Sequence, residues 1–135
     1  MKKNNLFSDV VLITPATFED ARGFFSETYN RAAIKKLGID IDFIQDNQSF
    51  SQNANTLRGI HFQSPPFAQS KLIRVLSGSI FDIFLDLRKD SEPYERYGSF
   101  TLNHEYGWLL ILKGLANGFV TWDAQTNSHY TVDVY

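Results

Sequence analysis

The amino-acid sequence predicts an all-β fold, a closed barrel or jelly roll with one short helix. Segments rich in β-branched and aromatic residues recur at short spacing, and each is bounded by glycine, asparagine, aspartate or proline. Only residues 30–37 have a helical pattern, in which Asn30 can cap about two turns and Gly38 can end them. Because no repeat or linker interrupts the 135 residues, we expect a single domain over residues 1–135.

The expected strands follow from local patterns. Residues 80–87 form the clearest one, since Asp82 and Asp86 interrupt an otherwise apolar run and mark a partly polar face. Residues 129–135 alternate between two sets of side chains, as a half-buried strand does. The other expected strands, rich in β-branched and aromatic residues, cover residues 10–14, 24–29, 42–49, 71–76, 97–102 and 108–112. A barrel of such strands commonly holds a ligand in its mouth.

The composition limits the kinds of partner. With 13 basic and 15 acidic residues, the formal net charge is −2, so the chain lacks the basic field that nucleic-acid binding needs. No apolar run is long enough to cross a bilayer, and the N-terminal residues do not resemble a signal peptide. The absence of cysteine excludes disulfides and fits a reducing compartment. We therefore expect a soluble, cytoplasmic protein without nucleic-acid or membrane partners.

His61 is the first candidate for chemistry. It lies three residues after Arg58, an offset that places the two side chains on opposite faces of a strand unless Gly59 bends the backbone. A histidine in an apolar strand also fits a purely structural role, and that alternative stays open. His104 and His129 lie in polar surroundings and are expected at the surface. Because no two histidines are close in sequence, a metal site is not expected.

Six segments of the chain together resemble the dTDP-4-dehydrorhamnose 3,5-epimerase family. They occur in family order and cover nearly the whole sequence. The matching segments are DARGFFSE (20–27), FIQDN (43–47), LRGIHFQ (57–63), PPFAQSKL (65–72), GSIFDIFLDLR (78–88) and GLANGF (114–119). The resemblance implies a cupin-like jelly roll, a homodimer, a nucleotide-diphosphate sugar as substrate, and a mechanism with no metal and no cofactor.

The resemblance also implies roles for individual residues. His61 corresponds to the base, Lys71 to the cation beside the substrate's ketone, and Tyr130 to the acid that returns a proton from the opposite side. Arg22 and Arg58 correspond to residues that hold the diphosphate or its sugar end. The residues that correspond to the lining of the nucleotide and sugar pockets are Phe25, Glu27, Gln45, Asn47, Asn117 and Tyr135.

The chemistry of these residue types agrees with the implied roles. A hydrogen next to a ketone is weakly acidic, so its removal needs a positioned base with a pKa near the working pH, and imidazole at about 6.5 meets that need. An ammonium group in a partly dried cavity stabilises the resulting enolate oxygen better than water does. Inversion then requires a donor across the ring, and a planar guanidinium can bind a diphosphate through two parallel hydrogen bonds. Taken one at a time, each residue also fits a structural or surface role.

Two departures from the family pattern affect the base. Asn117 stands where the family normally has histidine. Family members also continue for some tens of residues, and that extension supplies an aspartate that pairs with the base histidine, orients it and raises its basicity. We expect Asp82 to be a substitute partner for His61, because an unpaired carboxylate among apolar residues is costly. A purely structural Asp82 is an equally open alternative.

Three functions remain open from the sequence. The first is an epimerase acting at C3, at C5 or at both centres of a nucleotide-linked, 4-keto-6-deoxy hexose, in the synthesis of deoxysugars for cell-surface polysaccharides. The second is a nucleotide-sugar 3,4-ketoisomerase, which uses the same enolate chemistry but makes a different ketone. The third is a non-catalytic protein that binds a sugar nucleotide.

Overall fold

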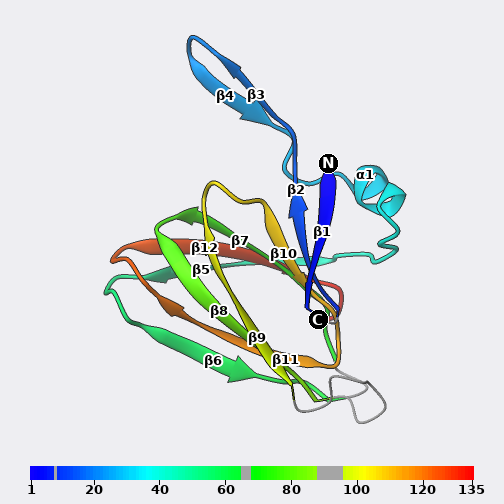
Figure 1. Cartoon of the computed structure of the whole chain (residues 1–135), viewed down its shortest axis with the longest axis vertical. Coiled ribbons are helices and arrows are strands. Elements are labelled where there is room, and N and C mark those ends of the chain that lie inside the picture. Colours follow the sequence, from blue (N-terminus) through cyan, green and yellow to red (C-terminus); the bar gives the residue numbers. More distant parts are fainter. Residues whose placement is uncertain (8, 65–67, 88–95) are drawn as a thin grey trace.

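The computed structural model describes residues 1–7, 9–64, 68–87 and 96–135, and two antiparallel sheets that face each other account for most of them (Figure 1). Residues 65–67 and Arg88, which belong to two of the matching segments, lie outside the described residues. The elements are β1 (Lys2–Phe7), β2 (Val10–Thr14), β3 (Thr17–Asp20), β4 (Gly23–Ser26), α1 (Arg31–Lys36), β5 (Gln45–Ser51), β6 (Leu57–His61), β7 (Lys71–Ser77), β8 (Ser79–Asp86), β9 (Tyr97–Asn103), β10 (Trp108–Ile111), β11 (Leu115–Thr121) and β12 (Thr126–Val132).

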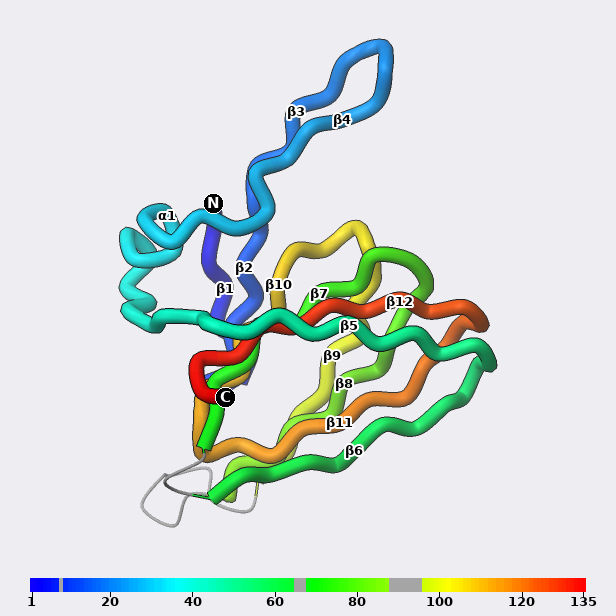
Figure 2. The backbone as a smooth tube through the Cα atoms, turned by 180° about the vertical axis from the view of Figure 1, so that it is seen from behind, coloured from blue at the N-terminus to red at the C-terminus, as the bar shows by residue number. Residues whose placement is uncertain are grey.

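The two sheets have six and four strands. The larger has the order β1-β2-β10-β7-β12-β5, and the smaller has the order β6-β11-β8-β9. Figure 2 shows the two layers from behind, with β5 in one layer and β6 in the other, joined by the turn at one end of the molecule. The predicted all-β jelly roll with one short helix is therefore confirmed. The helix is also confirmed, since the Asn30 side chain accepts a hydrogen bond of 3.0 Å from the backbone N–H of Ala33.

Four strands escaped the sequence prediction. One is β3, which pairs with β4 in the hairpin, and the residues of the other three lack the expected pattern. β1 is polar and exposed over residues 2–5, pairs with β2, and packs only its last two residues, Leu6 and Phe7, against the apolar cluster. β6 is interrupted by Gly59. β11 contains the sequence Ala116-Asn117-Gly118, which has low strand propensity, yet it is buried between β6 and β8. Tertiary pairing overrides local preference in each case.

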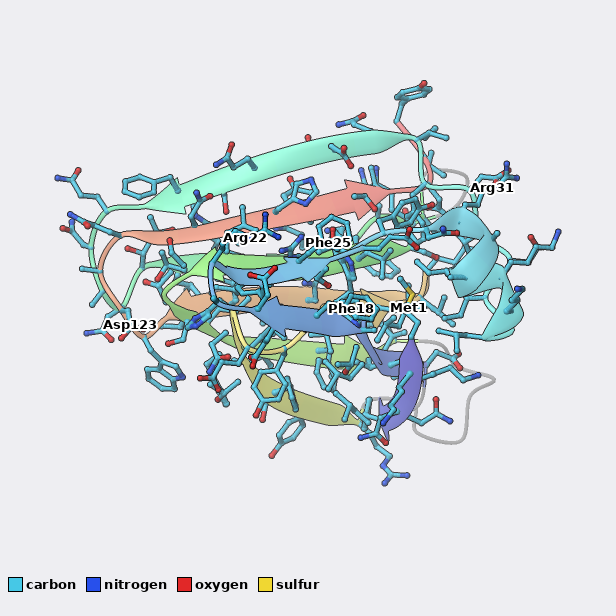
Figure 3. The ribbon with its side chains drawn as sticks, turned by 90° about the horizontal axis from the view of Figure 1, so that it is seen from above. Met1, Phe18, Arg22, Phe25, Arg31 and Asp123 are labelled. Carbon is cyan, nitrogen blue, oxygen red and sulfur yellow. The ribbon has the colours of Figure 1, made fainter. Side chains whose placement is uncertain are left out.

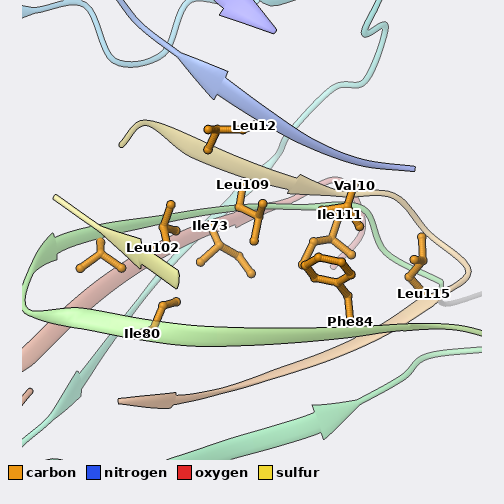
Figure 4. Close-up of a cluster of buried hydrophobic side chains, with 10 residues drawn as sticks. Val10, Leu12, Ile73, Ile80, Phe84, Leu102, Leu109, Ile111 and Leu115 are labelled. Carbon is orange, nitrogen blue, oxygen red and sulfur yellow. The ribbon is translucent and has the colours of Figure 1, made fainter. Parts of the chain in front are cut away.

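The interior of the sandwich contains one apolar cluster. Its side chains point toward one another from both sheets (Figure 4) and come from Val10, Leu12, Ile73, Val75, Ile80, Phe84, Leu102, Leu109, Ile111 and Leu115. A second cluster lies on the outer face of the larger sheet, where Ile34 of α1 covers Leu72, Trp108 and Leu110. Burial of each such side chain stabilises the fold by roughly 1.5–3 kcal/mol.

The β3–β4 hairpin extends away from the two sheets (Figures 1 and 2). Its residues Phe18, Phe24 and Phe25 are 62%, 73% and 71% exposed, which is unusual for three phenylalanines on four-residue strands. The residues expected as one strand over 24–29 thus divide between β4 and the segment that leads to α1. Within the described parts of the chain, no helix is both long enough and apolar enough to span a membrane.

Candidate active site

Two hollows of about 450 and 140 Å³ open on the side of the sandwich where β5 and β12 face β6 and β11. His61, Lys71 and Tyr130 line both of them, so the two hollows are parts of one cavity. The larger is also lined by Gln45, Asn47, Ile60, Phe62, Gln63, Gln69, Gly114, Leu115 and Val132. The smaller is also lined by Ser49, Arg58, Ile73, Asn117, Gly118 and Phe119.

The strand register of the larger sheet explains why its polar side chains enter the cavity. Directly paired residues on neighbouring antiparallel strands point to the same face. Val132 pairs with Gln45 on one side and Lys71 on the other. Two residues earlier, Tyr130 pairs with Asn47. Lys71, Tyr130 and the two amide side chains therefore share the inner face.

A backbone irregularity in β6 brings Arg58 and His61 to the same face. His61 pairs with Asn117 and Arg58 with Phe119, so the register shifts between them. Gly59 has a φ of +108°, and a Cβ atom there would lie 2.7 Å from the Cα atom of Gly118. Only glycine fits this bend. The condition stated from the sequence, that Gly59 must bend the backbone, is thus met.

The guanidinium of Arg58 is fixed by the neighbouring strand. Its Nε donates a hydrogen bond of 3.0 Å to Ser51 Oγ, and its Nη2 donates one of 2.9 Å to the carbonyl oxygen of Phe50. Both partners belong to β5, so the side chain bridges the two sheets. A preoriented guanidinium beside the cavity suits a planar anionic group.

The electrostatics of the cavity centre on Lys71 and Asp82. Burial lowers the pKa of Lys71, and the negative charge of Asp82 opposes that shift. The Nζ atom of Lys71 lies 6.0 Å from the centroid of the Tyr130 ring. Burial raises the pKa of Asp82 well above its usual value, while the Asn117 amide and the Lys71 ammonium oppose it. A charged ammonium at this position can stabilise an oxyanion in the cavity.

The expected pairing of Asp82 with His61 does not form. Asp82 has 0% exposure, and neither carboxyl oxygen has a hydrogen-bond partner among the described residues. Its electrostatic partners are Lys71 and Asn117 instead. The physical reason is position, since Asp82 pairs with Phe119 whereas the residue opposite His61 is Asn117.

Five predicted site residues lie outside the cavity of this chain: the buried Asp82 and four residues with exposed positions. Arg22 is on the hairpin, with its Nη2 2.7 Å from Asp20 Oδ2. Phe25 is on the same hairpin, and Figure 3 views both from above. Glu27 accepts a hydrogen bond of 2.9 Å from Asn30, and Tyr135 is 83% exposed. The structure brings together His61, Lys71, Tyr130, Arg58, Asn117, Gln45 and Asn47.

Some lining residues were missed from the sequence. Ser49 continues the period-two series begun by Gln45 and Asn47, and that alternation was a usable signal. Gln69 has no such signal, because its place depends on a hydrogen bond of 2.7 Å from its Nε2 to the carbonyl oxygen of Val134. Phe119 enters the cavity only through the unrecognised strand β11.

The other histidines do not belong to the cavity. His104 is exposed, as expected. His129 was expected at the surface, but its side chain is only 27% exposed because its ring packs 5.4 Å from the Trp108 ring, on the outer face of the larger sheet. No group of three or more potential metal-ligating side chains occurs within residues 1–7, 9–64, 68–87 and 96–135.

Together, the antiparallel jelly roll and the polar cavity between its sheets define a cupin-like protein with a candidate site inside the barrel. Comparison with known proteins gives the family. The sequence model of dTDP-4-dehydrorhamnose 3,5-epimerase matches residues 5–135, and the chain belongs to this family.

Two curated relatives carry the name of that enzyme. The chain is 41% identical to the one from Sinorhizobium fredii over 93% of its own length and 65% of the relative's. It is 43% identical to the one from Salmonella typhimurium over 84% of its own length and 62% of the relative's. The chain therefore spans less than two thirds of the length of these relatives.

Solved structures agree with the assignment. The dTDP-4-dehydrorhamnose 3,5-epimerase of Bacillus anthracis, with TDP and PPi bound, superposes with a TM-score of 0.94 at 44% identity, over 98% of this chain and 76% of that one. The epimerase of Legionella pneumophila, in complex with dTDP-4-keto-L-rhamnose, has a TM-score of 0.91 at 35% identity, over 99% and 72% of the two chains.

Proposed function

We propose that this protein epimerises C3, C5 or both centres of a nucleotide-linked 4-keto-6-deoxy hexose, with a dTDP sugar as the substrate. The observation that carries the proposal is that His61, Lys71 and Tyr130 line one cavity. Inversion next to a ketone requires a base, a group that stabilises the enolate and a proton donor on the opposite face, and an imidazole, an ammonium and a phenol can supply these. The names of the relatives, all dTDP-4-dehydrorhamnose 3,5-epimerases, support the same substrate class.

The proposed reaction begins with proton removal by His61. The imidazole takes the hydrogen from the carbon next to the ketone, and the electron pair moves onto the ketone oxygen as an enolate. The Lys71 ammonium stabilises that negative charge. Tyr130 then gives its phenolic proton to the same carbon from the opposite face, and the C=O bond forms again. Solvent takes the proton from His61 and returns one to Tyr130.

The two sheets supply the two sides of the substrate. His61 belongs to β6 of the smaller sheet, whereas Tyr130 and Lys71 belong to β12 and β7 of the larger sheet. A sugar ring between the sheets therefore meets a base and an acid from different walls. Arg58, held by β5, is proposed to bind the diphosphate or its sugar end.

Solvent exchange tests the proposal. In heavy water, the protein with dTDP-4-keto-6-deoxyglucose is expected to introduce deuterium at C3 or C5 and to form an epimer, both detected by NMR. The variant His61→Asn is expected to do neither, with an unchanged melting temperature. A 3-keto product would establish the ketoisomerase instead. Binding of the dTDP sugar without exchange would leave only a sugar-nucleotide binding protein.

We also propose that the protein is a homodimer in which the hairpin contributes to the site of the second copy. Phe18, Phe24 and Phe25 are too exposed for an isolated molecule, and Arg22 and Glu27 share their segment. Light scattering is expected to give twice the mass of one chain, and Phe24→Ser is expected to favour the monomer. A monomeric wild type would refute the proposal. A cytoplasmic location is proposed as well, consistent with a chain that has no cysteine.

A further inference from the structure

Asp82 is a buried acid that the proposed reaction does not use. It has 0% exposure, and neither carboxyl oxygen has a hydrogen-bond partner among the residues that the structure describes. Its in-register neighbours on β11 and β9 are Phe119 and Phe100, and its neighbours on the same face of β8 are Ile80 and Phe84. A carboxyl group in such surroundings is costly, so its presence requires an explanation.

The polar side chains that act on Asp82 belong to residues that line the cavity. The charge of Lys71 acts on Asp82 from the facing sheet, and the amide of Asn117 acts on it from the neighbouring strand, and both lower the pKa of the carboxyl. Both of these residues line the cavity, whereas Asp82 does not. Asp82 therefore lies behind the cavity wall and can influence a bound substrate only through them.

Of these two neighbours, only Lys71 carries a charge that Asp82 can balance. Lys71 is the first residue of β7 and is partly buried, and burial disfavours the charged form of its amine. A neutral amine there could not stabilise an enolate oxygen. The strands around Asp82 carry seven other charged or titratable groups, which are Arg58 and His61 on β6, Arg74 on β7, Asp86 on β8, Tyr97 on β9, and His129 and Tyr130 on β12.

We propose that Asp82 is a positioning residue for Lys71, acting as the buried counterion that holds its ammonium charged and directed into the cavity. The effect of Asp82 on catalysis rests on the proposed function, whereas its interaction with Lys71 does not depend on any substrate. Asn117 on β11 acts in the same direction as Lys71, since it also lowers the pKa of Asp82.

Lysine titration tests the pairing without substrate. In protein labelled with ¹³C at lysine Cε, the Lys71 signal is assigned by its loss in Lys71→Met. In Asp82→Asn, the midpoint of the Lys71 titration is expected to move to lower pH. Asp86→Asn is the matched control, because Asp86 has the same strand, face and 0% exposure, and it should leave the midpoint in place. Asp82→Leu, which suits the apolar neighbours, gives the same comparison if Asp82→Asn folds poorly.

An unmoved or raised Lys71 midpoint in the Asp82 variants would overturn the inference. With substrate, Asp82→Asn is expected to lower kcat for deuterium exchange by about tenfold or more with KM little changed, as loss of an orienting partner does. Unchanged kcat would show that the counterion does not assist the reaction. If wild type shows no exchange at all, the proposed function fails while the titration still decides the pairing.

Discussion

The space between the two sheets is filled by apolar side chains on one side of the molecule and is open and polar on the other side. Toward β2, β10 and β9 the space between the sheets is filled by side chains such as Phe84, Leu102 and Leu109, which have almost no exposure. Toward β5, β6 and β12 the same interior is an open polar cavity containing His61 and Lys71. The difference teaches that one half provides stability, whereas the other provides the polar cavity in which we propose the chemistry to occur.

Single strands cross the boundary between the halves. β7 places Lys71 in the cavity and Val75 in the apolar cluster, and β8 has Asp82 between Ile80 and Phe84. Polar groups in the cavity half are therefore held by strands that are anchored in the apolar half. Substitutions in the two halves should separate activity from stability.

The largest expected effect is on the cavity side. His61→Asn removes the proposed base, so the rate of deuterium exchange should fall at least about a hundredfold. His61 is exposed and belongs to neither apolar cluster, so the melting temperature should stay within a few degrees of wild type. Exchange measured by NMR and melting measured by calorimetry check the two parts. A large loss of stability would contradict the division of the halves.

Tyr130→Phe should separate two steps of the reaction. The phenyl ring retains the packing but has no proton to give, so His61 can still remove a hydrogen and return a deuteron to the same face. Deuterium incorporation should remain within about tenfold of wild type, while inversion falls about a hundredfold. NMR of the recovered sugar distinguishes exchange from inversion. Equal losses of both would assign Tyr130 another role.

Phe84→Ala should have the opposite result to His61→Asn. The ring is 1% exposed at the centre of the apolar cluster, packed 5.4 Å from the ring of Phe7. Its loss should lower the free energy of unfolding by about 3–5 kcal/mol, measured by urea denaturation. Exchange per folded molecule should be nearly unchanged at low temperature. A selective loss of exchange would show that the two halves are coupled.

The smallest expected effect concerns Lys71 and Asp82, which lie between the apolar half and the cavity half. Lys71→Met removes the countercharge of Asp82, so the pKa of that carboxyl should rise further, because burial then acts with less opposition. A raised folded-state pKa costs stability above the unfolded value near 4, so the variant should lose roughly 1–3 kcal/mol at pH 7 and recover as the pH falls toward 4.

The double variant Lys71→Met/Asp82→Asn provides the control. It removes both charges, and its free energy of unfolding at pH 7 should return close to that of wild type. Urea titrations of the two single variants and the double variant at two pH values complete the cycle. Additive losses would mean that the two side chains do not interact.

Much of the site could be predicted from the sequence, and the rest could not for physical reasons. Local alternation identified Lys71 and Tyr130 as members of strands, and the resemblance to a family identified His61. Their meeting in one cavity depends on pairings between strands far apart in the chain. The expected pairing of Asp82 with His61 was wrong, because Asp82 stands opposite Phe119 whereas His61 stands opposite Asn117. Which residues stand opposite each other depends on the strand register.

The sequence by itself determined the all-β class, the capped helix and the residue types available for chemistry. These depend on side-chain period, on caps and on turns, which act over a few residues. The tertiary structure alone decided that Arg58 and His61 share a face, that Asp82 meets Lys71, and that the hairpin carrying Arg22 leaves the barrel. Those outcomes depend on register, on a glycine-dependent bend and on the packing of one sheet over the other, which no local pattern encodes.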